Sequence, residues 1–464
     1  MRKTLAYTLV CLFYMFAMSE SWFYGRDAPD RWSVGEIWPL PQYVKYGKMN
    51  RTVSPGKISF DLEEKSSCDI LVMNVENYLK KWMFPFPVFA RGDADKFVVS
   101  IKVKEPCHSG FPQHGDNEEY ALHVSLDKAM ITSQTYCIRT VEIHDFPRFS
   151  VRGIMIDTSR HYLSKKVIKR QLDIMAMNKM NVLHWHLVDS ESFPYVSTTF
   201  PQLSQVGAYS SRHVYTPKAI RDILQYARIR GIRVIPEFDL PGHTGSWKGQ
   251  PGLLTECFDA SKKPTYQNLV DPSKEENFEF LTKFFSEVVN AFPDDFLHLG
   301  GDEVADYITE CWKIQDFMKK KSFGNNTTLL ENYFFDRLAE IMKNLPSKRR
   351  MVFWQEVFDN NKPKNGSIIQ VWKGNTHEEI LREVKAVTTK GFNVIVSACW
   401  YLNYIKYGAD WKDEIAGKFF IEFTVSFRTN EFNFSSAFNI NYYSKSTDGK
   451  ELETNEQQRK EMHI

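Results

Sequence analysis

Two adjacent carboxylates, Asp302 and Glu303, have the residue types and spacing best suited to catalysis in this sequence. They end an apolar run, HLGGDE from His298 to Glu303, whose two glycines would let a substrate approach the backbone. Two neighbouring carboxyl groups in a site shielded from water do not both ionise easily, so we expect one to keep its proton near neutral pH. Such a pair can cleave a glycosidic bond. The alternative is that the two acids merely open the next helix.

Two histidines, His184 and His186, lie two residues apart in a predicted strand, so their side chains point to the same face. One interpretation makes them metal ligands, as in amidohydrolases with a barrel fold. The other makes them a hydrogen-bonded inner layer that orients Asp189 or other polar groups. We favour the second interpretation, because no His-x-x-x-His or comparable signature supports further ligands. The predicted site therefore contains no metal ion.

The elements that must position these side chains are short apolar runs that alternate with segments of helical period from Val151 onward. Strands that alternate with helices form a parallel sheet, and seven such strands suggest a (β/α)8 barrel. A doubly wound sheet is the alternative, and it is disfavoured because no glycine-rich phosphate loop follows the first strand. The predicted strands are 153–157, 182–188, 232–238, 296–299, 351–354, 368–372 and 393–397.

In such a barrel, catalytic residues lie at the carboxyl ends of the strands. Carboxylates, histidines and tryptophans recur there, which predicts a polar cleft with aromatic walls. The aromatic content of 11 Trp, 21 Tyr and 35 Phe fits a cleft that stacks against sugar rings. The strand-end residues are Asp157, Arg160, His161, His184, His186, Asp189, Glu237, Asp239, His243, Asp302, Glu303, Trp354, Glu356, Trp372, Trp400, Tyr401 and Asn403.

Composition narrows the class of protein. The chain has 464 residues, with 59 Lys and Arg against 57 Asp and Glu, so its formal net charge is +2. That balance argues against a nucleic-acid binder, which would need a basic stripe. Apolar residues make up 43% of the chain, which is ordinary for a globular protein with a sizeable core.

The amino terminus predicts entry into the secretory pathway. Residues 1–21 carry Arg2 and Lys3, then an apolar run, then small residues, which is typical of a signal peptide. The run 5–17 is too short to span a bilayer, so we expect no stable membrane insertion. Cys11 leaves with this peptide, and six of the seven cysteines remain for an oxidising compartment. Glycosylation sequons begin at Asn50, Asn325, Asn326, Asn365 and Asn433.

Longer motifs surround the strand ends. They are VRGIMIDTSRHY at 151–162, NVLHWHLVD at 181–189, PEFDLPGH at 236–243, HLGGDEV at 298–304, FWQEV at 353–357, IQVW at 369–372 and WYLN at 400–403. Each motif alone is weak, but the set is highly specific. Together they resemble glycoside hydrolase family 20, and most closely the lysosomal β-N-acetylhexosaminidase subunits. The resemblance runs with gaps from about Ile37 to Asp413.

The resemblance implies an exo-acting enzyme that hydrolyses terminal non-reducing GlcNAc or GalNAc with retention and without a cofactor. The substrate's own 2-acetamido oxygen would attack the anomeric carbon, so no enzymic nucleophile is needed. Glu303 would act as general acid and then as base, while Asp302 would orient the acetamido group and stabilise developing positive charge. Arg152 would clamp the sugar hydroxyls, and Tyr401 would hydrogen-bond the acetamido oxygen. The implied substrate-binding residues are Arg152, Asp189, His243, Trp354, Trp372, Tyr401 and Asn403.

The resemblance also implies partners and covalent links. The substrates would be glycoprotein, glycolipid or chitin-derived glycans, and the chain would assemble as a homodimer or heterodimer without nucleic acid. Its destination would be the lysosome, with secretion as the alternative. Cys68 would pair with Cys107, and Cys257 with Cys311.

These patterns divide the chain into a signal peptide at 1–21, a small α+β domain at 22–147, the barrel at 148–413 and a divergent tail at 414–464. The tail lacks the motif with which the family forms its eighth strand and holds the far hydroxyls of the sugar. We therefore expect the eighth strand to be missing or replaced, with 419–427 as the candidate substitute.

Two alternatives to a glycoside hydrolase stay open at this point. The first is an inactive or unstable truncated isoform that still binds a partner subunit or a carbohydrate. The second is a metal-dependent amidohydrolase built on the two strand histidines.

Overall fold

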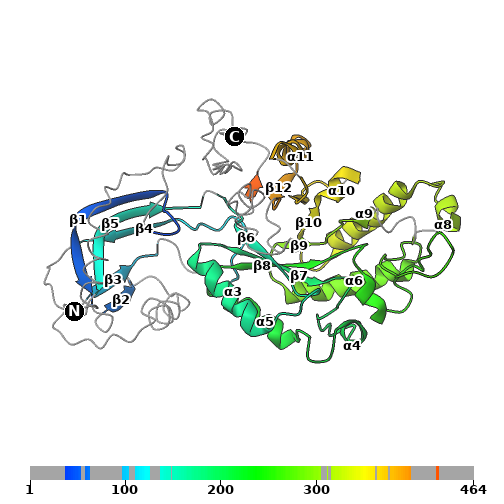
Figure 1. Cartoon of the computed structure of the whole chain (residues 1–464), viewed down its shortest axis with the longest axis horizontal. Helices are drawn as coiled ribbons and strands as arrows, with labels where there is room; N and C mark the ends of the chain where they lie inside the picture. The colour runs from blue at the N-terminus through cyan, green and yellow to red at the C-terminus, as the bar shows by residue number, and fades with distance from the viewer. Residues whose placement is uncertain are drawn as a thin grey trace, which may run out of the picture. The chain divides into compact units, whose positions relative to one another are not determined.

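The computed structural model of the chain describes residues 37–53, 58–62, 97–103, 110–125, 136–147, 149–304, 311, 315–360, 363–374, 377–398 and 425–427. The chain divides into two compact units, one of residues 1–110 and 116–148 and the other of residues 111–115 and 149–464 (Figure 1). The predictions on the signal peptide, Cys68, Cys107, Tyr401, Asn403 and Asn433 lie outside the described residues.

The smaller unit contains two sheets. β1 (Tyr43–Val53) and β4 (Tyr120–Val124) pair antiparallel with β5 (Tyr136–Asp145), in the order β1-β5-β4. β2 (Ile58–Leu62) pairs in parallel with β3 (Phe97–Ile101). Because side chains alternate along a strand, one face of the three-stranded sheet gathers apolar residues. They are Val44, Val141 and Ile143, with Ile37, Leu40, Tyr46 and Val124 packed against them.

The larger unit is built on an eight-stranded sheet, with the strands in chain order from β6 to β13. β6 to β12 run parallel and alternate with helices, so the predicted barrel class is confirmed. The strands are β6 (Gly153–Asp157), β7 (Val182–Val188), β8 (Arg233–Phe238), β9 (Phe296–His298), β10 (Arg350–Trp354), β11 (Ile368–Val371), β12 (Asn393–Val396) and β13 (Val425–Phe427).

The helices of this unit begin where the sequence supplies caps. Ser164 accepts from the N–H of Val167, and Thr216 accepts from that of Ala219, so each satisfies a backbone donor in a first helical turn. Figure 1 shows the helices beside the curled sheet. They are α3 (Lys165–Met177), α4 (Gln202–Gly207), α5 (Pro217–Arg228), η3 (Gly245–Gly249), α6 (Glu275–Ala291), α8 (Gln315–Lys320), α9 (Thr327–Asn344), α10 (Gln355–Asn360) and α11 (His377–Thr389).

Alternation along the strands sorts the core into two parts. On β7, Leu183, Trp185 and Leu187 belong to the large apolar cluster that includes residues of the helices. Val182, from the other face of β7, belongs to a second and smaller apolar cluster. That cluster is formed by Val151, Val182, Ile235, Phe296, Val352, Ile368 and Ile395. On the face that carries this smaller cluster, the next side chains towards the carboxyl ends of β7, β8 and β9 are the polar residues His184, Glu237 and His298.

The eighth strand position is filled in an unexpected direction. β13 pairs antiparallel with β12, with Val425 opposite Val396 and Phe427 opposite Val394. It lies within the run 419–427 that we expected as a substitute strand. Within the described ranges, β6 pairs only with β7, so the sheet has an edge there.

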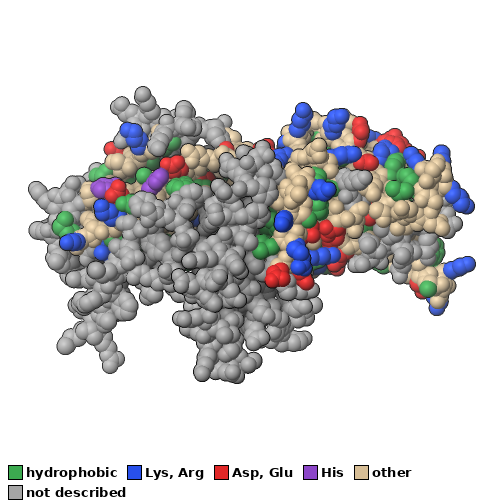
Figure 2. All heavy atoms as spheres, turned by 90° about the horizontal axis from the view of Figure 1, so that it is seen from above, with side chains coloured by type: hydrophobic (Ala, Val, Ile, Leu, Met, Phe, Trp, Pro, Cys, Tyr) green, Lys and Arg blue, Asp and Glu red, His purple; other side chains and the backbone are tan. Residues whose placement is uncertain are grey.

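The surface carries mixed charge. On the face that Figure 2 shows, basic and acidic side chains of the described residues lie among one another. Asn325 and Asn365 are exposed in turns, and the side chain of Asn326 accepts from the N–H of Leu329 at the start of α9. Asn50 lies in β1. Among the described residues, no helix is long and apolar enough to cross a membrane.

A disulfide joins Cys257 to Cys311, as the resemblance implied, and closes a separation of 54 residues. A cross-link stabilises mainly by removing freedom from the unfolded chain, and a loop of this length corresponds to about 4 kcal/mol. We therefore expect the Cys257→Ser/Cys311→Ser variant to unfold several degrees below the wild type, as measured by circular dichroism on heating. A reductant should lower the midpoint of the wild type by more than that of the variant, in which only the predicted link between Cys68 and Cys107 is left to reduce. Equal midpoints without reductant would contradict the expectation.

Candidate active site

The two acidic residues follow β9, where Gly300 and Gly301 turn the chain. Their φ angles are 65° and 97°, which residues with a Cβ atom rarely adopt. A Cβ atom on Gly300 would overlap Oδ1 of Asp239, and one on Gly301 would overlap the side chain of Val357. The N–H of Gly301 donates to Oδ1 of Asp239 over 2.9 Å. The turn thus packs against the residue that follows β8 and places the two acids beside it.

Glu303 faces an imidazole from the loop after β8. Nε2 of His243 lies 3.3 Å from Oε2 of Glu303 and 3.7 Å from Oδ2 of Asp302. Nδ1 of the same ring donates to Oδ1 of Asp189 over 3.0 Å. His243 and Glu303 have φ angles of 55° and 54°, in the left-handed region, and such strain costs about 1–3 kcal/mol per residue. Two strained residues in direct contact are typical of a functional site.

These contacts set the charges of the three groups. Burial lowers the pKa of His243, but its hydrogen bonds with Asp189 and Glu303 outweigh burial and raise that pKa well above its ordinary value. The same hydrogen bond lowers the pKa of Glu303. Burial opposes the ionisation of Asp189, yet hydrogen bonds from His186 and His243 hold its pKa well below the usual range. At neutral pH, His243 is therefore a cation between two carboxylates.

Burial separates the carboxyls of the acidic cluster by their pKa values. Burial raises the pKa of Asp302 to about 6. Burial and the neighbouring Asp302 raise the pKa of Asp239 well above its ordinary value. Of the adjacent pair, Asp302 is thus shifted towards its protonated form, whereas Glu303 is 38% exposed beside a cation and ionises readily. A third carboxyl, Asp239, is shifted in the same direction as Asp302.

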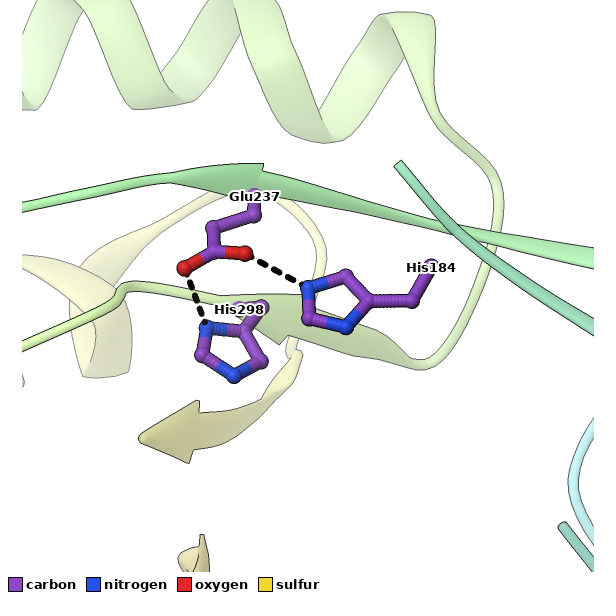
Figure 3. Close-up of side chains that lie close together, drawn as sticks. All are labelled: His184, Glu237 and His298. Atoms are coloured by element: carbon purple, nitrogen blue, oxygen red, sulfur yellow. Dashed lines mark hydrogen bonds and ion pairs between the residues drawn. The ribbon is translucent and has the colours of Figure 1, made fainter. Parts of the chain in front are cut away.

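A buried carboxylate ringed by imidazoles lies deeper in the same unit (Figure 3). Oε2 of Glu237 accepts from Nε2 of His184 over 2.6 Å and from Nδ1 of His186 over 2.8 Å. Oε1 lies 3.3 Å from Nδ1 of His298 and accepts from Nε1 of Trp354 over 2.8 Å. His186, Glu237 and His298 are register partners on β7, β8 and β9, so their side chains form one row.

These imidazoles also bear on the metal alternative. Three groups of described residues lie close enough to hold an ion: His184, Glu237 and His298; Asp189, Asp239 and His243; His243, Asp302 and Glu303. The ring nitrogens of His184 and His186 both contact one oxygen of Glu237, which gives each a hydrogen-bond acceptor. That pairing favours the interpretation of a hydrogen-bonded inner layer over that of ligands for a shared ion.

Two tryptophans and a lysine form the neighbouring wall. The rings of Trp354 and Trp372 lie 6.1 Å apart at 65°. Nε1 of Trp372 donates to Oε2 of Glu356 over 3.0 Å. Nζ of Lys373 lies 2.5 Å from Oε1 of Glu356 and 5.0 Å from the centre of the Trp372 ring. The residues at the ends of β10 and β11 are thus tied together by their side chains.

The structure separates Arg152 from this cluster. Arg152 precedes β6, and its guanidinium donates to the carbonyl oxygens of Lys179 and Phe149 over 2.7 and 2.6 Å. It therefore lies at the amino end of the strand, opposite the end that carries the acids. The guanidinium beside them belongs to Arg160, which lies 2.8 Å from Asp189 and 2.8 Å from Asp157. Our placement of Arg152 in the site is corrected accordingly.

The remaining predicted residues fall into two sets. Asp189, His243, Asp302 and Glu303 form one contact chain, while Trp354 and Trp372 face each other. The structure also brings in three groups to which we had assigned no role: Arg160, Glu237 and Lys373. All three end or follow strands. Arg160 and Glu237 were already candidates because of their positions at strand ends.

Comparison with known proteins agrees with this architecture. The model of Glycosyl hydrolase family 20, catalytic domain, matches residues 149–461, which include most of the tail that we expected to diverge. A solved structure of a chitobiase from Flavobacterium johnsoniae has a TM-score of 0.66 at 25% identity, over 80% of this chain. This chain spans only 60% of that protein's chain.

Curated relatives match over longer stretches. Beta-hexosaminidase A of Caenorhabditis elegans is 58% identical over 437 residues, which cover 88% of this chain and 79% of the relative. Beta-hexosaminidase subunit beta of Homo sapiens is 41% identical over 415 residues, which cover 81% of this chain and 73% of the relative. Because the family model matches more than half of the chain and these relatives are 58% and 41% identical over most of it, the chain belongs to glycosyl hydrolase family 20.

Proposed function

We propose that this chain is an exo-acting β-N-acetylhexosaminidase, which removes terminal GlcNAc or GalNAc from glycans with retention of configuration. The observation that carries the proposal is the acidic turn after β9, where Asp302 and Glu303 meet His243. The Asp302 carboxylate is 16% exposed and the Glu303 carboxylate 38% exposed, so both can reach a bound sugar and act on different parts of one bond. The relatives described above are named beta-hexosaminidases, which supports the same activity.

In the first step, the substrate's acetamido oxygen attacks the anomeric carbon and the glycosidic oxygen leaves with a proton. Asp302, ionised above its pKa, accepts the acetamido N–H and stabilises the positive charge that develops. Glu303 delivers the proton to the leaving oxygen. In the unliganded protein that proton is on His243, whose Nε2 lies 3.3 Å from Glu303. His243 can therefore load Glu303 by a single transfer before the first step, and it takes a proton back from Glu303 after the second.

In the second step, Glu303 takes a proton from water, which opens the cyclic intermediate and regenerates the acetamido group. Asp189 and Asp157 hold Arg160, whose side chain is 36% exposed. We assign to Arg160 the clamp on the sugar hydroxyls that the sequence had led us to place on Arg152. Trp354 and Trp372 wall the acetamido pocket in this proposal. The roles that the family resemblance implies for Tyr401 and Asn403 fall outside the described residues.

The proposal extends to assembly and location. Relatives named subunit alpha and subunit beta support a homodimer or heterodimer. The predicted signal peptide and sequons support the lysosome as destination, with secretion as the alternative. Activity on a chromogenic β-GlcNAc glycoside by the purified chain tests the proposal directly. Binding of the sugar without turnover would instead support a non-catalytic protein that binds carbohydrate.

Glu303→Gln should lower turnover by at least about 10²–10⁴-fold, because it removes the proton donor and keeps the shape of the side chain. The loss should be greatest for substrates with poor leaving groups, as steady-state kinetics would measure. Glu275→Gln is the matched control, since Glu275 pairs with Arg337 on the outer helices. It should leave activity unchanged. Undiminished hydrolysis of a poor substrate by the Glu303 variant would exclude the assignment.

The pH profile of kcat/KM should have an acid limb near pH 6. Asp302 has its pKa raised to about 6 by burial and must be ionised to act, so activity is present above that pH and falls as pH drops through it. Because Asp302 and Asp239 titrate together, the limb reports the pair. Asp239→Asn keeps a hydrogen-bond donor and leaves Asp302 to titrate alone, so an acid limb should remain but should then report a single group. A limb near the ordinary pKa of aspartic acid would contradict this view of Asp302.

A further inference from the structure

Glu237 contacts two parts of the site that have separate tasks. Its Oε1 accepts from the indole N–H of Trp354 over 2.8 Å. Its Oε2 accepts from Nδ1 of His186 over 2.8 Å. The carboxylate is fully buried, and a charge in that position persists only while donors surround it. The first oxygen thus faces the wall of the sugar pocket, and the second faces the chain of groups that ends at the acid.

That chain consists of five groups of alternating charge. Glu237 lies 2.8 Å from His186, and His186 lies 2.7 Å from Asp189. Asp189 lies 3.0 Å from His243, which lies 3.3 Å from Glu303. Each imidazole uses both of its nitrogens on carboxylates, which is the geometry of an imidazolium. A carboxylate that orients one ring therefore affects the charge and orientation of the next.

We propose that Glu237 is a positioning residue that couples the wall of the acetamido pocket to the proton relay ending at Glu303. The inference rests on the proposed function, because it takes Trp354 as pocket wall and Glu303 as acid. Glu237 touches neither the substrate nor the transferred proton. It fixes the indole through one oxygen and His186 through the other, so a displaced wall and a disturbed relay would have one common cause.

A second buried ion pair, at the amino end of the same strand, contains a carboxylate with only a structural role. Asp294 accepts from Arg233, at the amino end of β8, over 2.8 and 2.7 Å. Asp294 and Glu237 are both buried and paired, but Asp294 lies at the end of the strand away from the acids. Loss of either should lower stability, whereas only Glu237 is linked to the relay.

The electrostatic surroundings of Glu237 determine the sign of the pH effect. Burial and the contacts of His186 with Glu237 and Asp189 act in opposite directions on the pKa of His186, and the contacts raise it. Removal of the Glu237 charge lowers the pKa of the cations in the relay, because a negative charge stabilises their protonated forms. The titratable groups that face Glu237 from the strands and turns around it are His184, His186, His298, Asp239 and Asp302.

The test is Glu237→Gln in the full chain, with two readouts. The amide offers a donor where one of the carboxylate oxygens accepted, so kcat/KM should fall by about 10–100-fold. The alkaline limb of the pH profile, where the relay loses its proton, should move to lower pH. The dissociation constant of free N-acetylglucosamine, measured by calorimetry, should rise. An alkaline limb and an affinity equal to those of the wild type would overturn the proposal.

Two further variants separate the arms and remain informative if Glu237→Gln folds poorly. Trp354→Phe removes the indole N–H and keeps an aromatic ring, so it should weaken binding of N-acetylglucosamine and leave the alkaline limb in place. His186→Asn removes the ring and should move the alkaline limb with little effect on that affinity. In the Trp354→Phe background, Glu237→Gln should weaken sugar binding less than it does alone, because the contact is already lost. Equal effects of both single variants on both readouts would overturn the coupling.

Asp294→Asn is the control for a purely structural loss. It should lower the unfolding temperature and leave the pH profile and sugar affinity unchanged. If the wild type hydrolyses the chromogenic substrate and Glu237→Gln behaves as Asp294→Asn does, the inference fails and the proposed function stands. If the wild type neither hydrolyses that substrate nor binds N-acetylglucosamine, the proposed function fails and the inference fails with it.

Discussion

Each charge buried at the carboxyl ends of the strands needs an opposite charge within hydrogen-bond reach, and this pairing governs the centre of the molecule. A carboxylate moved from water into a protein interior is stable only when donors replace its hydration. Strand register supplies those donors, because His186 on β7 and His298 on β9 are the neighbours of Glu237 on β8. The sheet thus brings the counter-charges to the same level as the acid. A shift of one residue in register would turn all three side chains to the other face.

The same requirement explains the backbone around the acids. Asp239 can receive the N–H of Gly301 only because two residues without Cβ atoms let the turn after β9 approach it. His243 and Glu303 adopt left-handed φ angles that oppose stability locally. The apolar clusters on both faces of the sheet hold these angles in place. Stability in the core is thereby used to keep a strained constellation of charges at the rim.

Much of this arrangement could be predicted from periodicity and position. The run 182–188 is β7 with the predicted bounds. Its sequence VLHWHLV has apolar residues on both faces, which suits a strand that is buried on both faces. Asp189, His243 and the two acids meet because each follows a neighbouring strand. Arg152 was assigned to the wrong end, since a family motif drew attention to it although it precedes its strand. The part played by Asp239 was not predicted, because its contacts with Gly301 and Asp302 cross strands and no local pattern contains them.

The direction of β13 was beyond sequence reasoning, because three paired residues carry no signal of polarity. In a barrel of parallel strands, the loop that follows each strand lies at the catalytic end of the barrel. β13 begins opposite Val396 and ends opposite Val394, so it runs away from that rim. Whatever the eighth position contributes to the sugar must therefore come from the chain before the strand. At this one position, residues that act on the substrate are therefore expected before the strand and not after it, which is the reverse of the usual order in this fold.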